Sequence, residues 1–230
     1  MSKAMIEIAG LSKTFTLHNQ GGAVIEVMRD AALRVEPGEC VGLTGASGAG
    51  KSTLMRMVWG NYLAAAGRIM VAGTDVARAA PREVIALRRG QMSYVSQFLR
   101  VLPRVPTVDV VAEPLLLQGV AEDEALDRAR AVLARLNIPQ TLWGLSPTTF
   151  SGGEQQRVNI ARGFIRAVPV MLLDEPTASL DVVNRAVVLA LIAEAKARGA
   201  AILGIFHDEG ARAQVCDRLV DVTAFAPRVA

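Results

Sequence analysis

One stretch of the chain has the residue types that bind phosphate. Positions 45–53 read GASGAGKST, a glycine-rich run that ends in a lysine and two hydroxyl residues. Glycines let backbone N–H groups curl around phosphate oxygens at the start of a helix, the lysine would contact the β- and γ-phosphates, and the next hydroxyl would ligate Mg²⁺. The pattern predicts a Mg-ATP phosphate site formed by Gly45, Ser47, Gly48, Gly50, Lys51, Ser52 and Thr53.

A pair of acids could supply the metal and water chemistry at the same place. Asp174 and Glu175 follow the apolar run 170–173. A strand buried in a parallel sheet would deliver both carboxylates to its carboxyl edge, beside the glycine loop. Asp174 would then hold the Mg²⁺ shell, and Glu175 would act as general base, a contribution of about 10² to 10⁴ in rate. Two acids after a strand are also common solvated caps, so the pair takes its meaning from the loop.

These side chains need a sheet whose strands alternate with helices to position them. Apolar runs at 6–11 and 24–35, closed by a Pro-Gly turn, predict an antiparallel start. Later runs predict strands covered on both faces, which is typical of a parallel sheet. The helical periodicity of 107–137 predicts an inserted helical subdomain. The strands expected in the later part are 40–44, 68–73, 92–96, 169–173 and 200–206, and the helices 51–60, 81–90 and 182–198.

Composition limits the alternatives. The 230 residues fit a single α/β domain, 1–230, with the helical subdomain at approximately 97–166. No apolar stretch reaches the ~20 residues of a spanning helix, and no export signal precedes the acidic Glu7, so we expect a cytoplasmic protein without direct membrane insertion. A net charge of +3 does not indicate nucleic acid. Cys40 and Cys216 lack metal-site spacing, and both are expected to be buried.

A third motif identifies a family resemblance. The segment 150–157, FSGGEQQR, resembles the signature motif of ATP-binding cassette proteins, and the other motifs stand in that family's order. A helix beginning after Ser151 would direct the amides of Gly152 and Gly153 at an anion. The resemblance implies the ATP-binding cassette fold: a mostly parallel sheet, an antiparallel β subdomain and an inserted helical subdomain. It also implies that Ser151 and Gly153 contact the γ-phosphate of ATP bound to a second cassette, in a homodimer or a pair with a related cassette.

The same resemblance assigns further residues. Gln97 is similar to the glutamine that senses Mg²⁺ and water and would join Ser52 and Asp174 at the metal. Asp181 is similar to the residue that contacts the partner cassette, and His207 to the histidine that holds Glu175 and the γ-phosphate. Catalysis is thus expected from Glu175, His207 and Gln97.

An aromatic residue near the N-terminus has two interpretations. Phe15 stands where family members place a ring that stacks on adenine, and the plain alternative is a core residue. His18 is expected to be only solvated.

The sequence also resembles particular branches of the family. Segments 97–104, 149–165 and 199–209 are similar to an ATPase subunit of the bacterial carbon–phosphorus lyase system. This implies an accessory ATPase that works with the lyase core subunits in forming ribose 1-phosphonate 5-triphosphate, as in ribose 1-methylphosphonate 5-triphosphate synthase. Segment 102–108 also resembles lipoprotein- and macrolide-export cassettes, so a transporter subunit is the alternative. A nucleic-acid clamp would need a long coiled-coil insertion, which the sequence lacks.

Overall fold

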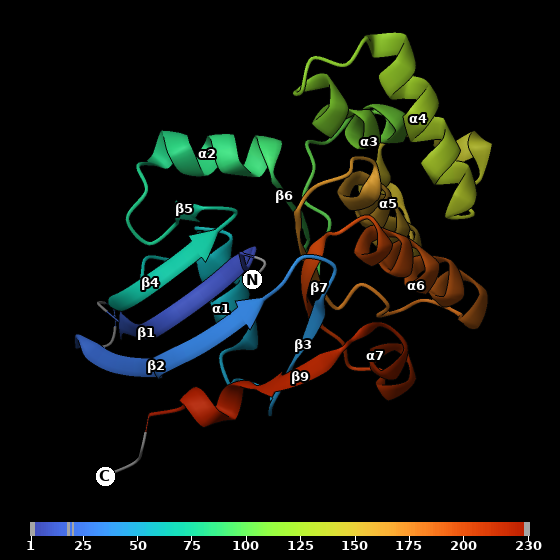
Figure 1. Ribbon diagram of the computed structural model, residues 1–230. Helices are drawn as coiled ribbons and strands as arrows, with labels where there is room; N and C mark the ends of the chain where they lie inside the picture. The colour runs from blue at the N-terminus through green and yellow to red at the C-terminus, as the bar shows by residue number, and fades with distance from the viewer. Residues whose placement is uncertain (1–2, 18, 20, 228–230) are drawn as a thin grey trace.

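The computed structural model describes residues 3–17, 19 and 21–227 of the chain. Its elements form two sheets of different kinds with helices packed around them (Figure 1). One sheet has five parallel strands in the order β6-β7-β8-β3-β9, and the other has four antiparallel strands in the order β2-β1-β4-β5. The predicted α/β class, with a parallel sheet and an antiparallel start, is confirmed.

The parallel sheet consists of β6 (Met92–Val95), β7 (Val170–Asp174), β8 (Ala201–Ile205), β3 (Cys40–Thr44) and β9 (Arg218–Asp221), and the antiparallel sheet of β2 (Ala23–Val35), β1 (Ile6–Leu17), β4 (Ala66–Val71) and β5 (Thr74–Asp75). The α-helices are α1 (Lys51–Val58), α2 (Pro81–Gly90), α3 (Thr107–Leu116), α4 (Glu122–Arg135), α5 (Gly152–Phe164), α6 (Val182–Ala197) and α7 (Glu209–Val215). Short 3₁₀ turns lie at Gln140–Leu142, Pro147–Thr149 and Val222–Phe225.

Both faces of the parallel sheet are buried, each in a different apolar cluster. In β7, Val170 and Leu172 pack on the side of the antiparallel sheet, whereas Met171 and Leu173 pack on the side of the helical subdomain. Successive side chains of a strand point to opposite faces, so a strand between two cores must be apolar at every position. This explains why β7 reads as an unbroken apolar run before its first carboxylate.

Helix α1 fills the space between the two sheets. Its side chains Leu54, Met55, Met57 and Val58 are fully buried and share a cluster with residues of both sheets. Burying side chains of this size stabilises a fold by roughly 1.5–3 kcal/mol each, as an upper estimate. The helix that begins at the glycine loop is therefore fixed from both sides.

The antiparallel sheet has a bulge where β1 and β4 come unusually close. Gly67 has φ +90°, and a Cβ there would lie 2.4 Å from the carbonyl oxygen of Gly10. The register between β1 and β4 shifts at this point, between Ala9 and Ser12. Because the obstructing atoms belong to the backbone, no side-chain rotation relieves the clash.

We therefore expect Gly67→Ala to destabilise the fold by about 2–4 kcal/mol, from overpacking and a disfavoured φ. Urea unfolding followed by circular dichroism measures the change. Gly144→Ala is the matched control, because a Cβ at Gly144 would meet nothing within 4 Å. Equal unfolding midpoints for the two variants would contradict the assigned contact.

The helical subdomain comes from helices α3, α4 and α5, which Figure 1 shows together on one side of the parallel sheet. They lie between residues 107 and 164, inside the range expected for this subdomain. In the periodic region 107–137, Ala129, Leu133 and Leu136 are buried, and Leu126 and Val132 pack partly against the same cluster. Helix α4 therefore joins the others through the periodic face read from the sequence.

Several boundaries differ from the sequence prediction. The strand expected at 68–73 is β4, and it ends at Val71 because Ala72 and Gly73 have φ 46° and 88° in a turn. The helix expected to reach residue 60 ends at Val58, before Gly60 with φ 80°. The elements β5, α7 and β9 were not predicted. These elements are short and contain few apolar residues, so they give little periodic signal.

The prediction for the cysteines holds for one of the two. Cys40 is buried, whereas Cys216 is half-buried, because it lies at the end of α7 near the surface. Their Sγ atoms are 4.0 Å apart and both thiols are free. His18 lies outside the described residues. Within the described ranges, no helix combines the length and the apolar character that crossing a bilayer requires.

Candidate active site

The parallel sheet gathers four of the predicted motifs at one edge. The glycine loop follows β3, Gln97 comes two residues after the end of β6, Glu175 follows β7, and His207 comes two residues after the end of β8. Because these strands are parallel neighbours, their carboxyl ends meet at the same edge. The topology therefore brings together residues more than 160 positions apart in the sequence.

The glycine loop has a conformation that requires glycine. Gly48 has φ +80°, although a Cβ there would meet no atom within 4 Å, so backbone geometry rather than packing selects glycine. Gly50, with φ +97°, is the N-cap of α1. The loop thus passes directly into a helix N-terminus, whose free amides attract anions. Ser52 and Thr53 are half-buried in the first turn of that helix.

Lys51 closes back over the loop. Its Nζ donates hydrogen bonds to the carbonyl oxygens of Gly45 at 2.7 Å and Ala46 at 2.9 Å. The ammonium group is therefore held beside the loop by neutral acceptors. A phosphate oxygen is a stronger acceptor for an ammonium group, because such a hydrogen bond joins two charges.

Asp174 is almost fully buried at the end of β7, with 3% of its surface exposed. The hydroxyl of Tyr94, on the neighbouring strand β6, donates to its Oδ2 at 3.2 Å. Burial raises the pKa of the Asp174 carboxyl, and the hydrogen bond from Tyr94 acts in the opposite direction. Gln97 is exposed and lines with Asp174 a cavity of about 440 Å³.

Glu175 has a backbone conformation that is rare for a residue with a side chain. Its φ of +56° is left-handed, which usually costs free energy and persists where the surroundings impose it. Here its N–H donates to the carbonyl of Ile205 at 3.0 Å, and Gln156 Nε2 donates to its carbonyl at 3.3 Å. His207 Nε2 lies 2.8 Å from Glu175 Oε1. The two predicted catalytic side chains are thus in hydrogen-bond contact.

The signature motif lies on the other face of the sheet. Ser151 is the N-cap of α5, and Glu154 reaches back to the Ser151 N–H at 2.9 Å, so the helix begins at Gly152 as predicted. Buried residues of α5 belong to the cluster on the helical side, whereas α1 belongs to the other cluster. A Cβ on Gly153 would lie 3.2 Å from the carbonyl oxygen of Ser179. The signature motif thus starts against the segment that leads to Asp181.

Asp181 caps a helix. Its carboxylate accepts from the backbone N–H and from the side-chain amide of Asn184, both at 2.8 Å, at the start of α6. The hydrogen bond from the Asn184 N–H lowers the pKa of this exposed carboxyl. The contact with a partner cassette that the family resemblance implies for Asp181 stays a prediction.

Phe15 lies in an aromatic cluster of its own. Its ring meets that of Tyr62 edge to face, with centroids 5.3 Å apart, and Lys13 Nζ is 4.5 Å from the Phe15 centroid. Phe15 is half-buried, so it has both core contacts and accessible surface. Stacking on adenine stays a prediction.

Three residues that hold the site were not identified from the sequence. Gln156 fixes the Glu175 backbone, Asn159 donates to the Ser96 carbonyl at 2.6 Å next to Gln97, and Tyr94 contacts Asp174. Gln156 and Asn159 are 7% and 5% exposed. Buried polar groups need hydrogen-bond partners. Two amide side chains three residues apart on the inner side of a helix could therefore have been recognised as residues that support the site.

Comparisons with known proteins identify the relatives of this chain. The family model described as ABC transporter matches residues 28–178. The macrolide export ATP-binding/permease protein MacB of Rhodopseudomonas palustris is 36% identical over 230 residues, covering 99% of this chain and 34% of that protein. MacB of Chromobacterium violaceum is 35% identical, covering 96% and 34%. The chain spans about a third of the length of these curated relatives.

Solved structures show the same fold. The dimeric, post-hydrolysis structure of the ATP-binding cassette MJ0796 bound to ADP and Pi has a TM-score of 0.87 at 24% identity, over 94% of both chains. The ATP binding subunit of an ABC transporter has a TM-score of 0.82 at 27% identity, over 94% of this chain and 85% of that one. With this fold, and with a family model that matches well over half of its residues, the chain belongs to the ABC transporter family as an ATP-binding cassette.

Proposed function

We propose that the chain binds Mg-ATP at its glycine loop and hydrolyses it in a site completed by a second cassette. The contact between His207 and Glu175 is the observation that carries this proposal. A carboxylate held by a neighbouring donor, at the sheet edge where the phosphate loop begins, is arranged to accept a proton from water. His207, once it donates to Glu175, keeps that carboxylate in one orientation.

The residues at this edge fit a magnesium ion. Mg²⁺ is usually bound by one or two protein oxygens, substrate phosphates and water. Ser52 and Asp174 offer such oxygens, with Gln97 on the same cavity as Asp174. Among the described residues, no three His, Cys, Asp or Glu side chains form a metal cluster of their own. When bound, the ion would neutralise charge on the phosphates.

Ser151 and Gly153 lie on the opposite face of the sheet from α1, so one chain offers two half-sites. We propose that Ser151 and Gly153 cap ATP held by the loop of a second copy or a related cassette, with Asp181 at the contact. The dimeric state named for MJ0796 supports this arrangement. Binding of ATP would then join two cassettes, and hydrolysis would separate them.

The driven partner is proposed to be a membrane export permease. The MacB relatives are named as ATP-binding and permease proteins, and this chain matches only about a third of their length. The chain itself would work in the cytoplasm. A second candidate is the carbon–phosphorus lyase core, favoured by the resemblance of segments 97–104, 149–165 and 199–209.

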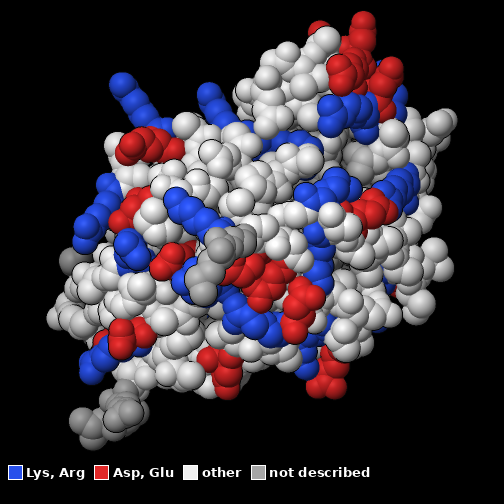
Figure 2. All heavy atoms as spheres, in the orientation of Figure 1, with Lys and Arg blue, Asp and Glu red and all other residues white. Residues whose placement is uncertain are grey.

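A groove beside the helical subdomain is suited to such a partner. Two cavities of about 330 and 550 Å³ meet there, both lined by Glu113 and Arg162. Exposed apolar side chains surround them, and a patch of this kind is typical of an interaction site. Figure 2 shows Lys and Arg side chains standing out over α2, whose residues Ile85, Arg88 and Arg89 line the smaller cavity. The apolar residues are Ile85, Leu102, Leu116 and Leu117.

Five arginines lie on α2 and in the loop that follows Gln97, and four of them are exposed. Arg82, Arg89, Arg100 and Arg104 are accessible. Arg88 is half-buried instead, because its guanidinium packs on Trp59 and donates to the Trp59 carbonyl at 2.8 Å. Arg88 therefore belongs to the support of the groove rather than to its rim.

We expect the double variant Arg100→Glu/Arg104→Glu to lose its partner, because it reverses two exposed charges, of which Arg100 lines the larger cavity. Affinity purification of the tagged chain measures the loss. If the partner is a permease, the unchanged chain should recover it only in detergent. If the partners are lyase subunits, the unchanged chain should recover them without detergent. The exposed Arg130→Glu on α4 is the control, and unfolding midpoints show that each variant is folded. Full recovery of the partner by the double variant would rule out this docking surface.

A further inference from the structure

Tyr94 stands between the docking groove and the magnesium end of the site. It lies on β6, directly opposite Leu172 of β7. Its hydroxyl donates to Asp174 Oδ2 at 3.2 Å, and Asp174 is 3% exposed. A buried carboxylate without a donor is costly, because it has lost its water. Among the hydrogen bonds of the described residues, this is the one made by the Asp174 side chain.

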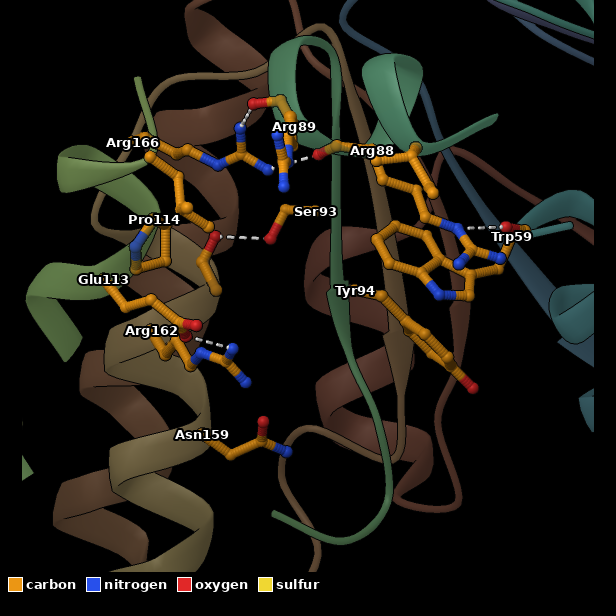
Figure 3. A pocket seen from close by; sticks show the side chains of 13 residues that line it. Trp59, Arg88, Arg89, Ser93, Tyr94, Glu113, Pro114, Asn159, Arg162 and Arg166 are labelled. Atoms are coloured by element: carbon orange, nitrogen blue, oxygen red, sulfur yellow. Dashed lines mark hydrogen bonds and ion pairs between the residues drawn. The ribbon is translucent and has the colours of Figure 1, made fainter. Parts of the chain in front are cut away.

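The Tyr94 ring is itself held in place. The Trp59 ring packs against it with centroids 5.5 Å apart and planes at 52°. Arg88 lies over the other ring of this stack, with its guanidinium carbon 4.9 Å from the Trp59 centroid, and its second nitrogen donates to Asn61 Oδ1 at 2.9 Å. Figure 3 shows Trp59 and Tyr94 side by side on one side of β6. Arg162 and Asn159 lie on the other side of this strand. The stack leaves the Tyr94 hydroxyl little freedom to leave Asp174.

The stack is a wall shared by two cavities. Trp59 and Tyr94 line the 330 Å³ part of the groove, and both also line the 440 Å³ cavity that contains Asp174 and Gln97. The position of the Asp174 carboxylate thus depends on side chains that also face the docking groove.

We propose that Tyr94 is a positioning residue for magnesium: its hydroxyl holds Oδ2 of Asp174 so that the carboxylate is oriented toward the ion before ATP arrives. This inference rests on the proposed function. Tyr94 need not touch nucleotide or ion. It acts through Asp174, by limiting the rotation of a carboxylate that borders an open cavity.

Tyr94→Phe removes the hydroxyl and keeps the ring on Trp59. We expect the Mg²⁺ concentration that half-saturates binding of a non-hydrolysable fluorescent ATP analogue to rise about 3- to 10-fold, which corresponds to the net contribution of one ordinary protein hydrogen bond. Binding of the analogue in EDTA should be unchanged. A purely structural role would lower the unfolding midpoint without moving the magnesium requirement.

The chain offers a matched control, because it has two tyrosines. Tyr62 lines the same 440 Å³ cavity, but its hydroxyl accepts from Arg56 at 3.0 Å instead of contacting Asp174. Tyr62→Phe should leave the magnesium requirement unchanged.

A local probe gives a second readout. The chain has two tryptophans, so Trp143→Phe leaves Trp59 as the reporter next to Tyr94. In that background, magnesium should change Trp59 fluorescence at the same concentrations as it promotes binding of the analogue, and Tyr94→Phe should shift both together.

The outcomes separate the two proposals. If the unchanged chain shows no magnesium-dependent binding of the analogue, the proposed function fails and this inference with it. If the unchanged chain shows it, and Tyr94→Phe behaves as Tyr62→Phe or needs less magnesium, only the role of Tyr94 is overturned.

Discussion

Glu175→Gln is expected to bind ATP with nearly unchanged affinity and to hydrolyse it at least ~100-fold more slowly, because the general base is lost. The amide has almost the shape of the carboxylate and can still pair with His207, now 2.8 Å from the carboxylate oxygen. The Gln156 side-chain amide donates to the carbonyl of residue 175, and the N–H of residue 175 donates to the Ile205 carbonyl. The substitution leaves both hydrogen bonds in place.

Phosphate release under saturating Mg-ATP gives the rate, and a fluorescent ATP analogue gives the affinity. Dimerisation of the variant in ATP, followed by size-exclusion chromatography, tests whether the closed pair persists when turnover is blocked. Glu122→Gln at the exposed start of α4 is the matched acid-to-amide control. Wild-type turnover in Glu175→Gln would remove Glu175 from the catalytic role.

Lys51→Ala is expected to weaken ATP binding by roughly 10- to 100-fold, since charge-assisted hydrogen bonds to phosphate are about twice as strong as neutral ones. Hydrolysis at sub-saturating ATP should fall at least in proportion. The change also removes the two hydrogen bonds from Lys51 to the loop carbonyls of Gly45 and Ala46, so the free loop loses its internal donor.

Titration with the fluorescent analogue, in Mg²⁺ and in EDTA, measures the affinity. Lys196→Ala is the contrast, because Lys196 makes structural bonds to the Val215 carbonyl at 2.8 Å and to Asp217 at 2.9 Å. It should lower the unfolding midpoint and leave ATP affinity alone. Lys51→Ala with unchanged affinity would mean that the loop holds phosphate by its amides only.

Much of the fold was predictable because its signals are local. The glycine loop, the strand before it and the helix after it are consecutive in sequence, and the apolar run of β7 ends at the acids themselves. Strand β9 was missed because its pairing partner is distant: Val41 of β3 pairs with Arg218. Its own residues are mostly exposed at the edge of the sheet, so no apolar run marks them.

The candidate site was likewise predictable only in part. Residue types and the order of the family motifs identified Lys51, Asp174 and Glu175 as site residues. They did not show which neighbouring residues hold these side chains in place. The left-handed φ of Glu175 depends on contacts with β8 and α5, which no local pattern encodes. Tyr94 reads as an ordinary strand residue until β6 and β7 are paired. Contacts between strands distant in sequence decide these details.

The hydrogen bonds of Lys51 to its own loop have a thermodynamic consequence. Lys51 does not present a bare ammonium group in this structure, so binding of a triphosphate would exchange one set of acceptors for another. The heat released on binding is therefore a difference between two sets of hydrogen bonds, while the carbonyls of Gly45 and Ala46 return to water. A modest binding enthalpy is compatible with a large contribution of Lys51 to affinity, because the enthalpy is a difference between two sets of hydrogen bonds and the free energy also contains the entropy of binding.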